Sequence, residues 1–341
     1  MGKKIFLAFS FLILTLSSLY CFWVVASYSL KTKTPHITTA QNYSTNFYED
    51  FYEGEITTSG QKSVSSAADV TAAANTTAKG KIITKTTNGS AANLKYNKIY
   101  VKNNTSLKID LKTELLSLPN LKITSTTKPQ VLIVHTHTTE CYMKNEKNYY
   151  TANDQTRTTN ENENIVAVGK VLANTLKGKG IGVVHATEKH DYPEYSGSYS
   201  RAEQTIKTYL KKYPTIKVVV DLHRDSVTEG SNKTALVTTI NGKKAAQVML
   251  VSGCQDGTVT GFKNWRQNFR LAIRLQQTME IMYSGLARPI LFTPRKYNQH
   301  LTTGSLLIEC GTEANTLDQA KYSATLLGNA LATTLNNLKE K

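Results

Sequence analysis

The stretch "VLIVHTHTTECY", Val131–Tyr142, decides the fold because a buried strand leads directly into a group of coordinating side chains. Four apolar residues in a row, Val131–Val134, are typical of a short strand buried on both faces of a parallel sheet. His135, His137 and Glu140 follow at once. Since ligands of open α/β sheets bind at the carboxyl ends of the strands, this stretch predicts a site where the strand ends.

Strand and helix patterns alternate along the rest of the chain. "NIVAVGKVLANTLKGKG" places Ile165, Val168 and Leu172 on one helical face. Further apolar runs in "IGVVHAT", "IKVVVDLHRD" and "GSLLIECGT" predict buried strands, and "SRAEQTIKTYLKKY" and "TLDQAKYSATLLGNALATTL" predict helices. We therefore expect an α/β fold with a mostly parallel sheet flanked by helices, over residues 129–341.

Two more of these expected strands also end in titratable side chains. Asp221 and His223 follow one apolar run, and Glu309 follows another. Parallel strands bring these ends to one edge of the sheet, and His135 and His137, two residues apart, share a face if the strand continues. Imidazoles and a carboxylate with one open position are the usual ligands of catalytic zinc. The candidate metal ligands are His137, His223, Glu140 and His135.

Single residues in this set have alternative interpretations. Glu140 is expected to be a ligand, and its alternative is a loop acid that caps backbone groups. Burying the carboxylate of Glu309 without a partner would be costly, so this residue suits a general base beside a metal. The alternative for Glu309 is a salt bridge to Arg224 or Arg295. Cys141 and Cys310 each adjoin a candidate, but adjacent strand residues point opposite ways, so we expect both in the core.

Composition narrows the class of partner. Lys and Arg outnumber Asp and Glu by 41 to 25, which gives a formal charge of +16. This balance favours a polyanionic partner such as a membrane face or a teichoic-acid-rich wall; a solvated basic surface is the alternative. The chain has no compact Lys/Arg run, P-loop or GxGxxG motif, so we expect neither nucleic acid nor nucleotide as a partner.

The first part of the chain predicts a tether. After Lys3 and Lys4, an uncharged, largely apolar run extends to about Leu30, long enough to span a bilayer at 1.5 Å per residue. We expect an uncleaved single-pass membrane anchor over residues 1–31, with "VVA" at Val24–Ala26 leaving a cleaved signal as the alternative. Residues 32–95, rich in Ser, Thr and Ala, predict a flexible linker, and residues 96–128 a short lead-in segment.

Four motifs carry a family resemblance. "HTHTTE", "DLHRDS", "YNQHL" and "GSLLIECGTEANTLDQA" resemble the stage II sporulation protein P family, from about Pro129 to the end of the chain. The resemblance implies a peptidoglycan hydrolase that acts as an N-acetylmuramoyl-L-alanine amidase, with endopeptidase activity on peptide cross-links also ascribed to the family. It implies work in forespore engulfment with stage II sporulation proteins D and M. The catalytic domain would then lie outside the cytoplasm, between the mother-cell and forespore membranes.

The domain is more distantly similar to the zinc-dependent amidase_3 fold. Matching the strand ends makes His137 and His223 zinc ligands and Glu309 the catalytic glutamate. The remaining glutamate ligand departs from that pattern, so that Glu140 and, in "NENENI", Glu161 or Glu163 stay open. His135 has no counterpart there and is either a ligand or a neighbour of the ligands.

A hypothesis for the mechanism gives further residues roles on the substrate side. Arg224 and His300 are candidates to hold the carbonyl oxygen or a stem-peptide carboxylate. Tyr297, Asn298 and His300 are expected to form a substrate-binding loop, with loop packing as the alternative. Two other functions compete with the amidase: a non-catalytic, membrane-tethered scaffold that binds the wall, and a zinc deacetylase acting on glycan.

Overall fold

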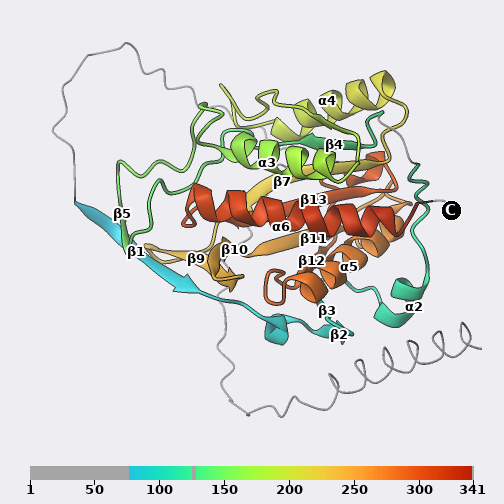
Figure 1. Cartoon of the computed structure of the whole chain (residues 1–341), viewed down its shortest axis with the longest axis horizontal. Helices are drawn as coiled ribbons and strands as arrows, with labels where there is room; N and C mark the ends of the chain where they lie inside the picture. Colours follow the sequence, from blue (N-terminus) through green and yellow to red (C-terminus); the bar gives the residue numbers. More distant parts are fainter. Residues whose placement is uncertain (1–76, 125–127, 340–341) are drawn as a thin grey trace, which may run out of the picture. The chain divides into compact units, whose positions relative to one another are not determined.

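The structure, a computed structural model, describes residues 77–124 and 128–339 (Figure 1). The expected membrane anchor and the linker up to residue 76 lie outside the described residues. Over the described ranges, no helix combines the length and the apolar character needed to cross a membrane.

The larger sheet carries the strands on which the sequence analysis placed the site. In the described part of the chain it has eight strands, in the spatial order β2 (Leu94–Tyr96), β3 (Ile99–Asn103), β12 (Ile290–Thr293), β11 (Val248–Gly253), β13 (Ser305–Thr312), β7 (Val218–Asp225), β4 (Val131–Val134) and β6 (Val183–His185). β13, β7, β4 and β6 are parallel, so the predicted strand ends do meet at one edge.

The prediction of a mostly parallel sheet was wrong, because the sheets are mixed. β11 runs antiparallel to β13, and β2 runs antiparallel to β3. The reversal begins at the hairpin between β9 (Asn232–Ile240) and β10 (Lys243–Ala246). Its turn residues Asn241 and Gly242 both have positive φ, 50° and 75°, the conformation of a two-residue hairpin turn. β11 follows this hairpin almost directly and enters the larger sheet in the opposite direction.

A second sheet pairs segments far apart in the chain. β1 (Ala78–Lys85) runs parallel to β9 and antiparallel to β5 (Tyr149–Thr151), while β8 (Thr228–Glu229) and β10 also pair with β9. β1 lies inside the stretch 32–95 for which the sequence predicts a linker, and β2 begins at the end of that stretch. Because Ile82 buries its side chain only when β9 is in place, a local pattern of polar residues did not reveal this strand.

Helices cover the two faces of the larger sheet unequally. α3 (Ile165–Gly178), α5 (Trp265–Met282) and α6 (Leu317–Asn336) share one core with the alternate residues Leu306, Ile308 and Cys310 of β13. α4 (Ser198–Lys212) packs on the opposite face, where Ile206 meets Leu132 of β4. The short helix α2 (Leu111–Leu116) is labelled in Figure 1. The 3-10 turns η2 (Gly89–Ala91) and η3 (Gln299–Leu301) complete the described elements.

The face that α4 covers extends beyond this helix over β13, β11 and β12. There Met249, Val251 and Leu307 form a small apolar cluster of their own, against which Leu291 and Tyr297 pack. Since successive strand residues alternate between faces, these side chains lie on the same face as Glu309 and away from α5 and α6. The site therefore has an apolar floor beside it.

Candidate active site

Three acidic or imidazole side chains alternate along β7, which puts them on one face of the sheet. Asp221, His223 and Asp225 are all buried, while Leu222 between them belongs to the helix-covered core. His223 Nε2 lies 2.9 Å from Asp221 Oδ1, and its Nδ1 lies 3.6 Å from Glu140 Oε2. One imidazole is thus held between two carboxylates.

Burial and the neighbouring charges have opposite effects on the pKa values of His223 and Glu140. Burial alone would lower the pKa of His223, but the carboxylates of Asp221 and Glu140 outweigh it and raise that pKa well above its usual value. Burial would raise the pKa of Glu140, but Arg224 and His223 outweigh it and lower that pKa. In the metal-free protein, a buried proton on His223 therefore balances buried carboxylates.

Asp221 also fixes the loop that follows β4. Its Oδ1 accepts a hydrogen bond from Thr136 N at 2.8 Å, and its Oδ2 accepts one from the Thr136 hydroxyl at 2.6 Å. The same carboxylate thus positions His223 and the turn that carries His137. A carboxylate that bonds the far nitrogen of a histidine is the usual support of a metal-binding imidazole.

His137 faces His223 across this loop. The two ring centroids lie 5.4 Å apart, and His137 Nδ1 is buried without a hydrogen-bond partner. Its other nitrogen, Nε2, lies 3.3 Å from the hydroxyl of Tyr195, whose ring stacks on the imidazole at 4.7 Å. Burial lowers the pKa of His137 to about 4, so the ring is neutral and offers a free lone pair.

The loop before α4 encloses His137, and the sequence analysis missed it. Asp191 accepts hydrogen bonds from Thr139 N and from Arg157 Nη1, and the Arg157 guanidinium lies 4.7 Å from the centre of the Tyr195 ring. Tyr199, on α4, meets the edge of His137 at 5.7 Å. The tyrosines in "HDYPEYSGSYS" were the signal in the sequence, but nothing local connected them to β4.

Glu309 stands between the histidine group and the apolar floor. On β13 its Cα neighbours are His223 on one side and Met249 on the other. Its carboxyl is buried, and Oε2 has no hydrogen-bond partner. Burial, with Asp225 second, raises the pKa of Glu309 to about 8. The alternative for Glu309 is a salt bridge to Arg224 or Arg295, but the Arg224 guanidinium donates to the carbonyl oxygens of Cys141 and Thr156. Arg288 pairs with Asp225 at 2.6 Å.

His135 does not share a face with His137, because the strand does not continue as that expectation required. β4 ends at Val134, and His135 stays on the side of Val131 and Ile133, under α3. Its Nδ1 lies 2.8 Å from Leu222 O, and its Nε2 lies 2.8 Å from His185 Nε2. Burial and His185 lower the pKa of His135 to about 3, so it is a neutral, internally bonded core residue.

Gly169 of α3 provides a test of this packing. A Cβ at this position would lie 2.6 Å from His185 Nε2 and 2.7 Å from His135 Nε2. We expect Gly169→Ala to lower the free energy of unfolding by about 1–3 kcal/mol despite the better helix propensity of alanine, because the buried rings must move. Urea unfolding measures this, and Gly178→Ala, in the same helix with no atom within 4 Å, is the control that should not lose stability.

The structure places the remaining candidates in different surroundings. Arg224 is buried, and its guanidinium donates to the carbonyl oxygens of Cys141, Asp225 and Thr156, so this side chain ties loops together. Its backbone N–H donates to Glu140 Oε2 at 3.1 Å. Glu161 is exposed and Glu163 pairs with Lys144, so of the three glutamates only Glu140 lies beside His223.

The expected substrate loop is only partly at the site. Tyr297 packs against the apolar floor. Asn298 is buried, and its amide donates to Tyr199 O at 2.8 Å. His300 lies beside Phe262, with Nε2 3.8 Å from Glu203 Oε1. Cys141, Cys254 and Cys310 are buried and free, as core residues rather than ligands.

The donor types at this edge fit zinc. His137 Nδ1 has no partner, His223 Nδ1 faces Glu140, and Asp221 supports the far nitrogen of His223. Over residues 77–124 and 128–339, however, no three His, Cys, Asp or Glu side chains are drawn together as a ready-made metal site. The chemistry of the donors, and not a converged geometry, is what supports a metal here.

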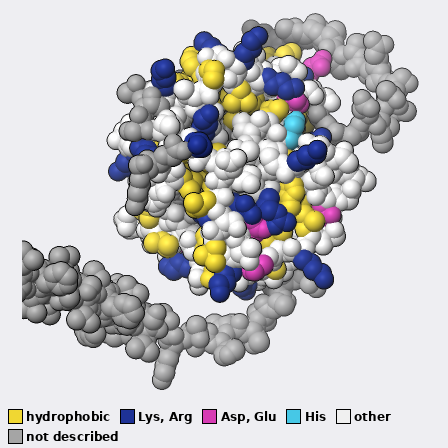
Figure 2. All heavy atoms as spheres, turned by 90° about the vertical axis from the view of Figure 1, so that its right-hand side faces the viewer, with side chains coloured by type: hydrophobic (Ala, Val, Ile, Leu, Met, Phe, Trp, Pro, Cys, Tyr) yellow, Lys and Arg dark blue, Asp and Glu magenta, His cyan; other side chains and the backbone are white. Residues whose placement is uncertain are grey.

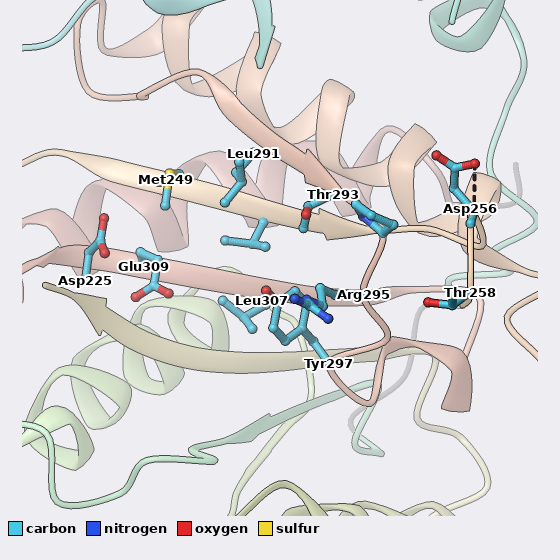
Figure 3. Close-up of a pocket in the computed structure, with 13 residues that line it drawn as sticks. Asp225, Met249, Asp256, Thr258, Leu291, Thr293, Arg295, Tyr297, Leu307 and Glu309 are labelled. Carbon is cyan, nitrogen blue, oxygen red and sulfur yellow. Dashed lines mark hydrogen bonds between the residues drawn. The ribbon is translucent and has the colours of Figure 1, made fainter. Parts of the chain in front are cut away.

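A pocket of about 320 Å³ opens beside Glu309 (Figure 3). Glu309 and Asp225 lie at one end and Asp256 and Thr258 at the other, with Arg295 and the other labelled side chains between (Figure 3). Its lining residues are Asp225, Met249, Val251, Asp256, Gly257, Thr258, Leu291, Thr293, Pro294, Arg295, Tyr297, Leu307 and Glu309. The candidate general base thus borders both the histidine group and a cavity that can hold a small ligand.

The solved structures that match this chain include two amidases. The N-acetylmuramoyl-L-alanine amidase AmiC2 of Nostoc punctiforme matches 62% of this chain and 97% of its own, at 14% identity and a TM-score of 0.35. The CwlD amidase from Clostridioides difficile, solved in complex with the GerS lipoprotein, matches 61% and 98% at 12% identity and a TM-score of 0.36.

Sequence comparison gives the family. Stage II sporulation protein P of Bacillus subtilis (strain 168) is 29% identical over 214 residues, 60% of this chain, and the match spans about half the length of that relative, 50%. The family model of stage II sporulation protein P (SpoIIP) matches residues 29–332, most of the chain. The chain therefore belongs to the stage II sporulation protein P family.

Proposed function

We propose that this chain is a zinc-dependent peptidoglycan hydrolase that cleaves the amide bond between the lactyl group of N-acetylmuramic acid and L-alanine. Membership of the stage II sporulation protein P family supports a hydrolase of this kind in sporulation. The observation that carries the proposal is the position of Glu309, a buried carboxyl next to His223 on the neighbouring strand.

The types of donor side chain at the site support zinc as the metal. His137, His223 and Glu140 would hold zinc, which when bound polarises a carbonyl oxygen and lowers the pKa of a coordinated water. Asp221 keeps His223 oriented, and the stacked Tyr195 keeps the His137 ring in place. His135, whose two nitrogens are both engaged, is left out of this set.

Glu309 has the properties of a residue that acts first as general base and then as general acid. Its pKa of about 8 lies near neutrality, where one group can both take and give a proton. It would accept the proton of the attacking water and then donate it to the leaving amine of L-alanine. The carbonyl carbon gains the oxygen of water, the C–N bond breaks, and Glu309 returns to its starting state.

We also propose where the protein acts and with which partners. A membrane anchor in residues 1–31 would tether the domain between the mother-cell and forespore membranes, where stage II sporulation proteins D and M are the proposed partners. Peptide cross-links are the second class of bond to test. Lysine and arginine side chains are scattered over the face in Figure 2, and a formal charge of +16 suits an anionic wall.

Digestion of isolated peptidoglycan tests the proposal. The purified full chain is incubated with sacculi, with and without a zinc chelator, and the soluble products are identified by mass spectrometry. Zinc-dependent release of stem peptides with a free L-alanine amino group is expected. Release of acetate would indicate a deacetylase, and binding to sacculi without cleavage would indicate a non-catalytic scaffold.

Asp221→Asn tests the support of His223. Asparagine keeps the shape but cannot supply the carboxylate that lies 2.9 Å from His223 Nε2. We expect zinc affinity to fall roughly 10–100-fold, as for the loss of other such partners, measured by competition with a chromophoric chelator. Asp110→Asn, at the exposed start of α2, is the control, and equal affinities of the two variants would contradict the assignment.

A further inference from the structure

We propose that the end of α2 is a docking surface for an anionic membrane, in which Leu116 and Leu118 enter the boundary between head groups and acyl chains. In the described part of the chain these are the two most exposed large hydrophobic side chains, at 72% and 69%. Single exposed apolar side chains are common on proteins, but two such leucines within three residues form a local apolar tip that favours a partner surface. This tip lies apart from the proposed active site, so its test does not depend on the amidase reaction.

The tip is held firmly by α5. Glu114 of α2 is buried, and its carboxylate pairs with Arg266 and with Arg270, the latter at 2.8 Å. Arg274 donates to the carbonyl oxygen of Leu115. Because a helix of six residues is not stable alone, these arginines keep α2 in place. The two leucines are therefore presented to solvent on a fixed support.

Positive charge surrounds the two leucines. Along residues 102–124 four lysines are exposed, and the single exposed acid is Asp110. Its carboxylate accepts hydrogen bonds from Lys112 N at 3.0 Å and from the Thr113 hydroxyl at 2.6 Å, so it caps the first turn of α2. Lys112 lies one helical turn before Leu116, on the same side of α2. Exposed ammonium groups thus accompany the apolar side chains that face solvent.

This combination favours a lipid surface over the polar polyanions of a cell wall. A polar, anionic polymer would pair with the lysines but would leave the leucines in water. A bilayer with anionic lipids offers a negative surface for the lysines and an apolar layer directly beneath it. The side of the molecule that carries α2 is drawn in Figure 2, where hydrophobic side chains lie among Lys and Arg side chains.

The position of α2 gives this docking a consequence for the active site. Asn120, which follows α2, accepts a hydrogen bond at its carbonyl oxygen from the Thr303 hydroxyl at 3.1 Å. Thr303 directly precedes β13, which begins at Ser305. Glu309 lies about 20 Å further along the chain, toward the carboxyl ends of the parallel strands. A domain seated on lipid through α2 would therefore turn its catalytic edge away from the membrane.

The test measures whether residue 116 enters the bilayer when the full chain is mixed with vesicles. Leu116→Trp is compared with Ile281→Trp, a matched control at a side chain 64% exposed near the end of α5. The vesicles are made of phosphatidylcholine with brominated acyl chains, with or without phosphatidylglycerol. Bromine quenches tryptophan that enters the apolar layer, and the emission of the wild-type chain is subtracted. A third chain combines Leu116→Trp with Lys108→Gln and Lys112→Gln.

With phosphatidylglycerol present, we expect the added emission of Leu116→Trp to fall about 2-fold or more and that of Ile281→Trp to stay unchanged. The two lysine substitutions, or vesicles without phosphatidylglycerol, should restore most of this emission. Equal quenching at both positions would mean that the domain only collides with the bilayer. Absence of quenching at residue 116 would leave the leucines to a protein partner or a second copy of the chain. Either result, or quenching that depends on neither the lysines nor the anionic lipid, overturns the inference.

Discussion

Glu309→Gln is expected to lower the turnover of peptidoglycan by about 100- to 10,000-fold while zinc stays bound. Glutamine has the shape of the protonated carboxyl that burial favours at this position, so the fold and the ligands His137, His223 and Glu140 should be unaffected. It cannot take a proton from water. Steady-state release of stem peptides gives the turnover, and elemental analysis gives the zinc content.

Glu313 provides a matched control for this variant. Glu313 is also a buried glutamate near the end of β13, but it pairs with Lys233 at 3.1 Å and bonds the Ser226 hydroxyl. Glu313→Gln should lose stability and keep most of its turnover. Turnover of Glu309→Gln within a few-fold of wild type would remove Glu309 from the mechanism.

His223→Ala is expected to abolish both zinc binding and detectable turnover, and to lower the free energy of unfolding of the metal-free protein by about 3–5 kcal/mol. The imidazole of His223 lies between two buried carboxylates, with Nε2 2.9 Å from Asp221 and Nδ1 3.6 Å from Glu140. When the imidazole is removed, the negative charges of these two carboxylates stay buried without the positive charge that balances them. Urea unfolding in the presence of chelator measures this cost.

His137→Ala separates the loss of zinc binding from the loss of folding stability. This imidazole is a neutral ring whose Nδ1 has no partner, so its removal leaves no buried charge. It should also abolish zinc binding, with a smaller loss of stability than His223→Ala. Equal losses of stability in the two variants would mean that His223 does not act as the charged centre of the group.

The sequence was sufficient to predict the strand ends. β4, β7 and β13 each contain a short continuous apolar run, which is typical of strands buried on both faces of a sheet, so Glu140, His223 and Glu309 could be expected at one edge. The alternation along β7 likewise places Asp221 and His223 on one side. These inferences depend on local patterns, and local patterns are what a sequence carries most directly.

Features that depend on long-range contacts could not be predicted. The side chains of His135 and His137 lie on different sides of the sheet because β4 ends at Val134, and nothing in "HTHT" marks that end. The stacking of Tyr195 on His137 joins residues 58 positions apart. β1 becomes a strand only against β9, about 150 residues away, which is why a polar, Thr-rich stretch looked like linker.

The location of bound zinc tests the central claim most directly. Crystals of the zinc-loaded Glu309→Gln variant, measured at the zinc absorption edge, show the metal by its anomalous scattering. A single peak among His137, His223 and Glu140, next to residue 309, is the result that this account predicts. A peak at His135 and His185, or none at this edge of the sheet, would contradict it.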